Sequence, residues 1–162
     1  MRSIYYYLKV KILSKGDFKM INKIKKVWGS EDWLVLNEKY CAKFLNLNHK
    51  YQCSVHYHAR KDETFYVLAG EVELYVVELL PYYQIYPLTN DDITTYYKEI
   101  QKRKKEILTS MVKVRLTTGQ QYRLKPFTAH RFTSITSGSK ILEISTTHYE
   151  EDSYRLTESG KV

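Results

Sequence analysis

Hydrophobic and polar residues alternate over short stretches of the chain from Trp33 onward, a pattern typical of β-strands with one buried face. These stretches are rich in Val, Ile, Tyr, Phe and Thr, and glycines at positions 70, 119 and 138 separate several of them. Many short strands at close spacing favour an all-β sandwich or barrel over an α/β fold. The expected strands are Trp33–Leu36, Tyr40–Leu47, Gln52–Tyr57, Glu63–Leu68, Glu71–Glu78, Lys113–Thr117, Gln121–Leu124, His130–Ser134 and Lys140–Thr146.

One segment has helical spacing instead. Asn90-Asp91-Asp92 offers side chains that can cap a helix N-terminus, and Ile93–Met111 follows without Gly or Pro. The pattern predicts an amphipathic helix at about residues 91–111, inserted between two halves of a β domain and packed on it along one stripe. That stripe comprises Ile93, Tyr96, Tyr97, Ile100, Ile107 and Met111.

Charge is concentrated at the start of the chain. Residues 1–26 hold eight of the 26 basic side chains and one of the 18 acidic ones, so they carry nearly all of the net charge of +8. We interpret 1–26 as a basic extension, either a solvated tail or a segment upstream of a second start at Met20, and nucleic-acid binding is not favoured. With 162 residues in total, 27–150 is expected to form one domain and 151–162 a C-terminal tail.

No apolar run approaches the roughly 20 residues that cross a bilayer, and the first residues lack a signal-peptide pattern. We therefore expect a cytoplasmic protein without a membrane partner. The two cysteines, Cys41 and Cys53, have neither the spacing of a Cys-x-x-Cys motif nor that of a disulfide framework.

The residues from Ser54 to Glu63 carry the clearest chemistry. His56 and His58 lie two apart, so on a strand both project from the same face. Glu63 follows after a short turn, and His130 begins another expected strand. Three imidazoles and one carboxylate would leave open positions on a metal ion, as a catalytic centre requires.

The run His56-x-His58-x4-Glu63-x6-Gly70 resembles the first motif of the cupin superfamily. Gly119 and His130 stand at the spacing of the second cupin motif. Several turn positions depart from the family pattern: Lys50 and Phe127 stand where the family has glycine, Lys125 where it has proline, and Ser134 where it has asparagine.

The resemblance covers about residues 27–150 and implies a double-stranded β-helix, the jelly-roll cupin barrel. It also implies that His56, His58, Glu63 and His130 hold one divalent metal ion, whether Mn, Fe, Co, Ni or Zn. The alternative is a metal-free barrel lined by the same polar residues.

A narrower resemblance concerns sugar-isomerase cupins of the mannose-6-phosphate isomerase and D-lyxose isomerase types. It rests on the Trp28-Gly29 pair, on residues 61–68, on Pro126-Phe127-Thr128-Ala129-His130, and on residues 143–148. It implies a metal-dependent isomerase that interconverts aldose and ketose forms of a sugar or sugar phosphate through an enediolate. A metal-dependent dioxygenase and a non-catalytic sugar-binding module are the alternatives.

Strand parity and position near the barrel mouth supply candidates for the other roles. We expect Lys125 and Glu143 to act as catalytic acid and base, and Lys43 and His148 to bind the substrate. Arg131 and Lys61 are the places to look for a phosphate-binding group, although the alternation points Arg131 outward.

Three further residues are out of phase with the expected ligands. Tyr57 and Tyr66 should face away from the metal, on an outer face that a second copy could bury, which favours a homodimer. Cys53 shares this outer parity and is expected to be an inert buried thiol.

Overall fold

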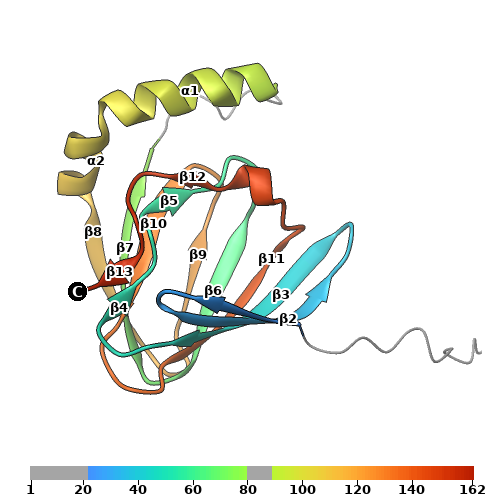
Figure 1. Cartoon of the computed structure of the whole chain (residues 1–162), viewed down its shortest axis with the longest axis vertical. Helices are drawn as coiled ribbons and strands as arrows, with labels where there is room; N and C mark the ends of the chain where they lie inside the picture. The colour runs from blue at the N-terminus through green and yellow to red at the C-terminus, as the bar shows by residue number, and fades with distance from the viewer. Residues whose placement is uncertain (1–21, 80–88) are drawn as a thin grey trace, which may run out of the picture.

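The alternation of buried and exposed side chains predicted from the sequence is present in the long strands. The computed structural model describes residues 22–79 and 89–162, and its strands form two antiparallel sheets that face each other as a barrel (Figure 1). One sheet has the strand order β1 (Asn22–Lys26), β2 (Gly29–Leu36), β3 (Tyr40–Leu47), β11 (Lys140–Thr146), β6 (Glu63–Ala69), β9 (Gln121–Leu124). The other has the order β12 (Tyr154–Arg155), β5 (His56–Tyr57), β10 (Thr128–Ser134), β4 (Tyr51–Gln52), β13 (Gly160–Lys161), and β7 (Glu71–Glu78) joins β10 to β8 (Val112–Thr117).

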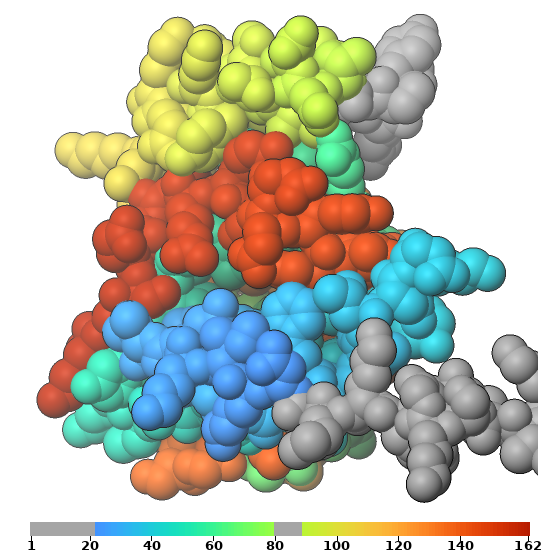
Figure 2. Space-filling view, turned by 45° about the vertical axis from the view of Figure 1, so that its right-hand side comes forward, coloured from blue at the N-terminus to red at the C-terminus, as the bar shows by residue number. Residues whose placement is uncertain are grey.

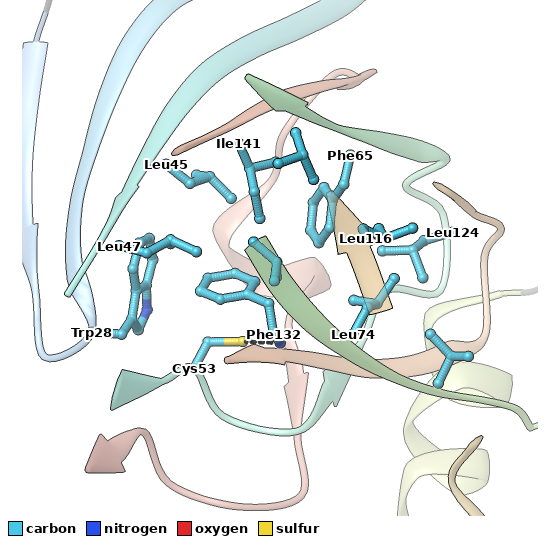
Figure 3. Packing of buried hydrophobic residues seen from close by; sticks show 13 residues of the cluster. Trp28, Leu45, Leu47, Cys53, Phe65, Leu74, Leu116, Leu124, Phe132 and Ile141 are labelled. Carbon is cyan, nitrogen blue, oxygen red and sulfur yellow. Dashed lines mark hydrogen bonds between the residues drawn. The ribbon is translucent and has the colours of Figure 1, made fainter. Parts of the chain in front are cut away.

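The barrel interior is apolar at one end and polar at the other. Leu45 of β3, Phe65 of β6 and Ile141 of β11 are buried in the apolar end, where they pack around Trp28 and Phe132 (Figure 3). The inward residues nearer the other end of the same three strands are charged: Lys43, Glu63 and Glu143. Because side chains on one face of a strand recur every two residues, the alternation that builds the core also lines the polar end.

The inserted segment forms two helices instead of the single one predicted. α1 (Asn90–Lys102) and α2 (Lys104–Ser110) meet at Arg103. The N-cap of α1 is Thr89, whose side chain accepts a hydrogen bond from the Asp92 backbone in a capping box. The helix therefore begins at Asn90, one residue earlier than predicted. The predicted apolar stripe is confirmed: Ile93, Tyr96, Ile100 and Ile107 are buried, and Tyr97 and Met111 are partly so.

These helices lie along one side of the barrel (Figure 1) and cover the outer face of β5. Tyr57 is fully buried there against Tyr96, Phe127 and Tyr154. The outer face that was expected to meet a second copy is thus covered within the chain at Tyr57, whereas Tyr66 is half-buried on the outside of β6. The homodimer stays a prediction. Among the described helices, neither combines the length and apolar character of a membrane span.

Both predicted terminal boundaries differ from the structure. Residues 22–26, placed in the basic extension, form β1 and pair along their whole length with β2; residues 1–21 lie outside the described residues. Residues 151–162, placed in a tail, form β12 and β13, which pair with β5 and β4. Residues 22–26 and 151–162 therefore add strands to the two sheets. Leu156 is buried with residues of β5 and of the helices.

The strand expected over Gln52–Tyr57 is interrupted. β4 ends at Gln52 and β5 begins at His56, and the intervening residues break the alternation. The prediction that Cys53 faces outward is therefore wrong: it lies in the interior core, where its Sγ accepts a hydrogen bond from the Phe132 backbone at 3.3 Å (Figure 3). The expectation that this thiol is buried is confirmed, and burial raises its pKa to about 12.

Candidate metal centre and adjoining cavity

Three histidine side chains converge at the polar end of the barrel. His56 in β5 and His130 in β10 are paired across neighbouring strands, with ring centroids 4.5 Å apart. His58 follows β5, and one nitrogen from each of the three rings lies within 4.8 Å of the others. The structure thus brings together the three histidines that the sequence identified.

Hydrogen bonds fix the orientation of all three rings. The Nδ1 atoms of His56, His58 and His130 lie 2.9, 2.6 and 2.9 Å from the backbone oxygens of Ser54, Asp152 and Thr128. A carbonyl oxygen only accepts hydrogen bonds, so each Nδ1 is the protonated donor. In a neutral ring Nε2 then keeps its lone pair, which is the arrangement found in histidines that bind metals.

The electrostatics of the site keep two of these rings neutral. Burial lowers the pKa of His56 well below its ordinary range, and the neighbouring rings of His130 and His58 lower it further. Burial likewise lowers the pKa of His58 to about 4, against the opposing pull of Glu63. Neutral imidazoles are the form that coordinates a cation.

Glu63 completes the cluster. Its Oε1 lies 3.1 Å from His130 Nε2 and 3.8 Å from His58 Nε2. Within the described part of the chain, Glu63 Oε1 and His130 Nε2 are buried atoms without a hydrogen-bond partner. In the neutral form of His130 that carries its proton on Nδ1, the lone pairs of Nε2 and of Glu63 Oε1 would face each other across 3.1 Å. A cation between them removes this conflict, so the donor set fits a divalent metal ion.

A buried lysine that the sequence suggested only as a phosphate ligand lies beside this cluster. Lys61 Nζ donates hydrogen bonds to Glu63 Oε2 and Glu143 Oε1, both at 2.5 Å. Burial alone would lower the pKa of Lys61, but Glu143 and Glu63 outweigh it and raise this pKa above its ordinary value. Lys61 has the inward parity of Glu63 and Phe65, which is the signal that could have identified it.

The two carboxylates on either side of Lys61 are ionised. Burial would raise the pKa of Glu63, but the Lys61 ammonium outweighs it and brings this pKa well below the ordinary range. Burial opposes ionisation of Glu143 as well, but Lys61 and Lys43 lower its pKa. The site therefore contains a buried ammonium held between two buried carboxylates.

Lys43 and His148 form a second group of polar side chains next to Glu143. Lys43 Nζ is 3.7 Å from Glu143 Oε1 and 3.4 Å from His148 Nδ1, and it stands 4.1 Å from the ring centroid of Trp33. Glu31 Oε2, 3.8 Å from Lys43 Nζ, accepts a hydrogen bond from the Trp33 indole at 2.9 Å. The structure thus places Lys43 and His148 together, next to Glu143.

A cavity of about 370 Å³ joins these groups, within the usual size range of small-molecule sites. Its polar lining includes His56, His58, Lys61, Glu63, Glu143, Lys43 and His148. Lys125 is not brought to this site. Leu124, which pairs with Glu63, points inward, so the next residue is exposed on the outside. Arg131 also lies outside, over the ring of Tyr75 at 4.5 Å.

Two departures from the cupin motifs keep a glycine-like backbone. Lys50 has a φ of 61° and Phe127 a φ of 60°, in the left-handed region that glycine adopts most easily. At Phe127 the side chain packs against Tyr57 and Tyr96, with ring centroids 5.9 and 5.4 Å apart. Both positions therefore have a backbone conformation that glycine would adopt easily, with other residues in them.

Comparison with known proteins supports the fold. No protein-family model matches the sequence, and no curated protein matches it. Among solved structures, KdgF from Halomonas sp. superposes with a TM-score of 0.52 at 14% identity, covering 75% of this chain and 81% of that one. L-ribose isomerase from Cellulomonas parahominis gives 0.53 at 18% identity, covering 75% and 59%.

A third similar structure is oxalate decarboxylase from Lactobacillus farciminis, with a TM-score of 0.57 at 10% identity. The match covers 84% of this chain and 34% of the decarboxylase, so the chain spans about a third of that protein's length. All three neighbours are cupin-fold proteins, and likeness at such identities shows the fold alone. The chain therefore has the fold of the cupin superfamily, a jelly-roll β-barrel with an inserted helical segment.

Proposed function

We propose that this chain is a metal-dependent sugar isomerase that moves a proton between adjacent carbons of an aldose or ketose. The observation that carries the proposal is the buried Glu143–Lys61 pair, which lines the same cavity as His56, His58 and Glu63. An L-ribose isomerase among the similar structures agrees with this reaction class. The substrate is a sugar or a sugar phosphate of the lyxose or mannose type.

His56, His58, Glu63 and His130 would hold the metal ion. When bound, a divalent ion supplies Lewis-acid stabilisation of negative charge on substrate oxygens. The hydrogen bonds from the three Nδ1 atoms to backbone carbonyls fix the rings in the productive orientation before any ligand enters.

Glu143 is the best-placed base. Its carboxylate is ionised and lines the cavity. Its Oε1 lies 2.5 Å from Lys61 Nζ and 3.7 Å from Lys43 Nζ. An ionised carboxylate can take the carbon-bound proton of a sugar and return it to the neighbouring carbon. Lys61, which stays protonated, can donate a hydrogen bond to an oxygen that gains charge during this transfer.

Lys43 and His148 are suited to bind sugar hydroxyls. Both line the cavity and meet at 3.4 Å. Trp33 beside them offers an aromatic surface, with the His148 ring packed edge-on at a centroid distance of 5.0 Å. Such a group of polar side chains next to an aromatic ring is typical of sites that orient a small polar ligand.

The test is isomerisation of a panel of sugars by the protein loaded separately with Mn, Fe, Co, Ni or Zn. D-lyxose, L-ribose, D-mannose and their phosphates are incubated in D₂O, and NMR follows both ketose formation and deuterium at C1 of the ketose. We expect one combination to turn over, and we expect Glu143→Gln to lower kcat about 10²–10⁴-fold, the usual contribution of a general base.

Glu73→Gln is the matched control. Glu73 is a half-buried carboxylate of β7 that bonds to Tyr75 and Lys113 away from the cavity, so its loss should leave turnover unchanged. Absence of turnover with every sugar and metal would refute the proposal, as would full activity in Glu143→Gln. Sugar binding without turnover would indicate a binding module, and oxygen consumption with Fe(II) would indicate a dioxygenase.

A further inference from the structure

Asp152 makes an unusual set of contacts with the segment that carries His58 and Lys61. It lies in the short 3-10 turn Glu150–Asp152 and is only 2% exposed. Its Oδ1 accepts hydrogen bonds from the backbone nitrogens of Ala59 at 2.9 Å and Arg60 at 3.2 Å. Its Oδ2 accepts from Arg60 at 3.2 Å and from Lys61 at 3.0 Å.

The same residue also orients a proposed metal ligand. The backbone oxygen of Asp152 accepts the Nδ1 hydrogen of His58 at 2.6 Å, the shortest of the three ring bonds. One residue thus holds His58 through its carbonyl and the following three residues through its carboxylate. Figure 2 shows the C-terminal residues, in red, between the helices above and the N-terminal strands below.

We propose that Asp152 is a positioning residue, through which the C-terminal segment sets the place of His58 in the metal centre and of Lys61 beside Glu143. This inference rests on the metal centre of the proposed function. Three consecutive backbone N–H groups directed at one carboxylate form a concave anion site, here filled from within the chain. The carboxylate fixes the peptide segment, and the carbonyl fixes the ring that precedes it.

The geometry explains why an aspartate is required. Both carboxylate oxygens accept hydrogen bonds, so Asp152→Asn replaces one acceptor by an NH₂ group that meets a backbone N–H. The backbone carbonyl that holds His58 is chemically unchanged in this variant. A loss of metal affinity would therefore report a change in position and not the removal of a ligand.

The experiment measures the affinity of the full chain for Zn²⁺ and Co²⁺ by competition with a chromophoric chelator, together with the visible spectrum of the Co²⁺ form. We expect Asp152→Asn to bind each ion about 10–100-fold more weakly, the usual effect of removing a group that supports a ligand. Its Co²⁺ spectrum should also change, because His58 is no longer held in the same orientation.

Two control variants separate positioning from general effects. Glu151→Gln removes the same charge from the exposed neighbouring residue of the turn, and its affinity and spectrum should match wild type. Ile100→Ala destabilises the fold from the buried face of α1, in the cluster on the outer side of β5. It should retain wild-type affinity well below its melting temperature.

The outcomes distinguish the two proposals. Equal affinity and an unchanged spectrum in Asp152→Asn and wild type would overturn the positioning role while leaving the metal centre intact. An equal loss of affinity in Ile100→Ala would also overturn it, because the effect would then follow stability. Failure of wild type to bind either ion would refute the proposed centre, and the positioning role with it.

Discussion

Lys61 is expected to contribute strongly to the stability of the metal-free protein, and Lys61→Met tests this. The lysine is 4% exposed and lies between Glu63 and Glu143, which are 2% and 5% exposed. Methionine fills a similar volume without the charge, so two buried carboxylates lose the cation they share. Removing one partner of a buried ion pair costs about 3–5 kcal/mol.

This magnitude is large relative to the whole free energy of unfolding, which is about 5–15 kcal/mol for a domain. At roughly 2–4 °C per kcal/mol for a chain of this size, the melting temperature should fall by about 6–20 °C. Lys43 remains 3.7 Å from Glu143 and offsets part of the loss there. Glu63 has no second lysine within ion-pair distance among the described residues, so most of the cost arises at that carboxylate.

The assay is urea unfolding with excess chelator, followed by tryptophan fluorescence and circular dichroism. Lys98→Met, on the exposed face of α1, is the matched control and should change stability by less than about 0.5 kcal/mol. The double variant Lys61→Met/Glu143→Gln should lose less than the sum of its single variants, with a coupling of about 0.5–3 kcal/mol.

Two results would refute this reasoning. Equal stability of Lys61→Met and Lys98→Met would show that the carboxylates do not depend on the lysine. A loss in the double variant equal to the simple sum of the two single losses would show that Lys61 and Glu143 do not interact in solution. Either result would remove the acid–base pair on which the proposed proton transfer rests.

Two further predictions concern packing and backbone conformation, and both use the same unfolding assay. Ile100→Ala should cost about 2–5 kcal/mol, because Ile100 is 2% exposed under the helical insertion; a cost below 1 kcal/mol would show that the helix packs loosely. Lys50→Gly and Phe127→Gly both relieve a left-handed backbone, worth about 1–2 kcal/mol. Lys50→Gly should be neutral or up to about 1 kcal/mol stabilising. Lys50 is exposed, so little packing is lost, but glycine loses more entropy on folding and offsets part of the relieved strain. Phe127→Gly should be less favourable than Lys50→Gly, because it also gives up part of the roughly 1.5–3 kcal/mol that a fully buried Phe contributes, together with ring contacts to Tyr57 and Tyr96; equal effects would contradict the packing role of Phe127.

The features predicted correctly are those encoded over a few neighbouring residues. His56 and His58 share a strand face, Glu63 follows at the motif spacing, and the helical stripe has an unbroken period. Each of these depends on local geometry, which the order of side chains specifies directly. The strand pattern predicted an all-β sandwich or barrel, and the resemblance to the cupin motifs implied the jelly-roll barrel in particular.

The errors arose where the alternation stops. Lys125 was expected near the barrel mouth from strand parity and position, but it follows the inward Leu124 at the end of β9, so it lies on the outside with Arg123. Cys53 was misplaced because the alternation is broken in the gap between β4 and β5. Lys61 was the better candidate for the acid–base group, because it lies two residues before Glu63 and therefore faces the interior as Glu63 does.

No sequence pattern indicated that residues 151–162 pair with β5 and β4 and contact His58. β12 and β13 are two residues long each, too short to show a period, and the residues between them look like a polar tail. Asp152 acts on His58 through its backbone carbonyl, a group present in every residue. Such a role depends on where the chain returns in three dimensions, and residue types alone do not specify that.

The polar end of the barrel explains why these late residues are needed. Lys43, Glu63 and Glu143 reach the interior by the same alternation that places Leu45, Phe65 and Ile141 in the core. Burying such charges is costly unless each finds a partner. Lys61 supplies the partner for the carboxylates, and its backbone is in turn held by Asp152. Among the described residues of this cluster, Glu63 Oε1 and His130 Nε2 are the buried polar atoms that still lack a hydrogen-bond partner. A cation bound between them would remove this cost. The residues that stabilise the polar interior are therefore the ones that prepare it to bind an ion.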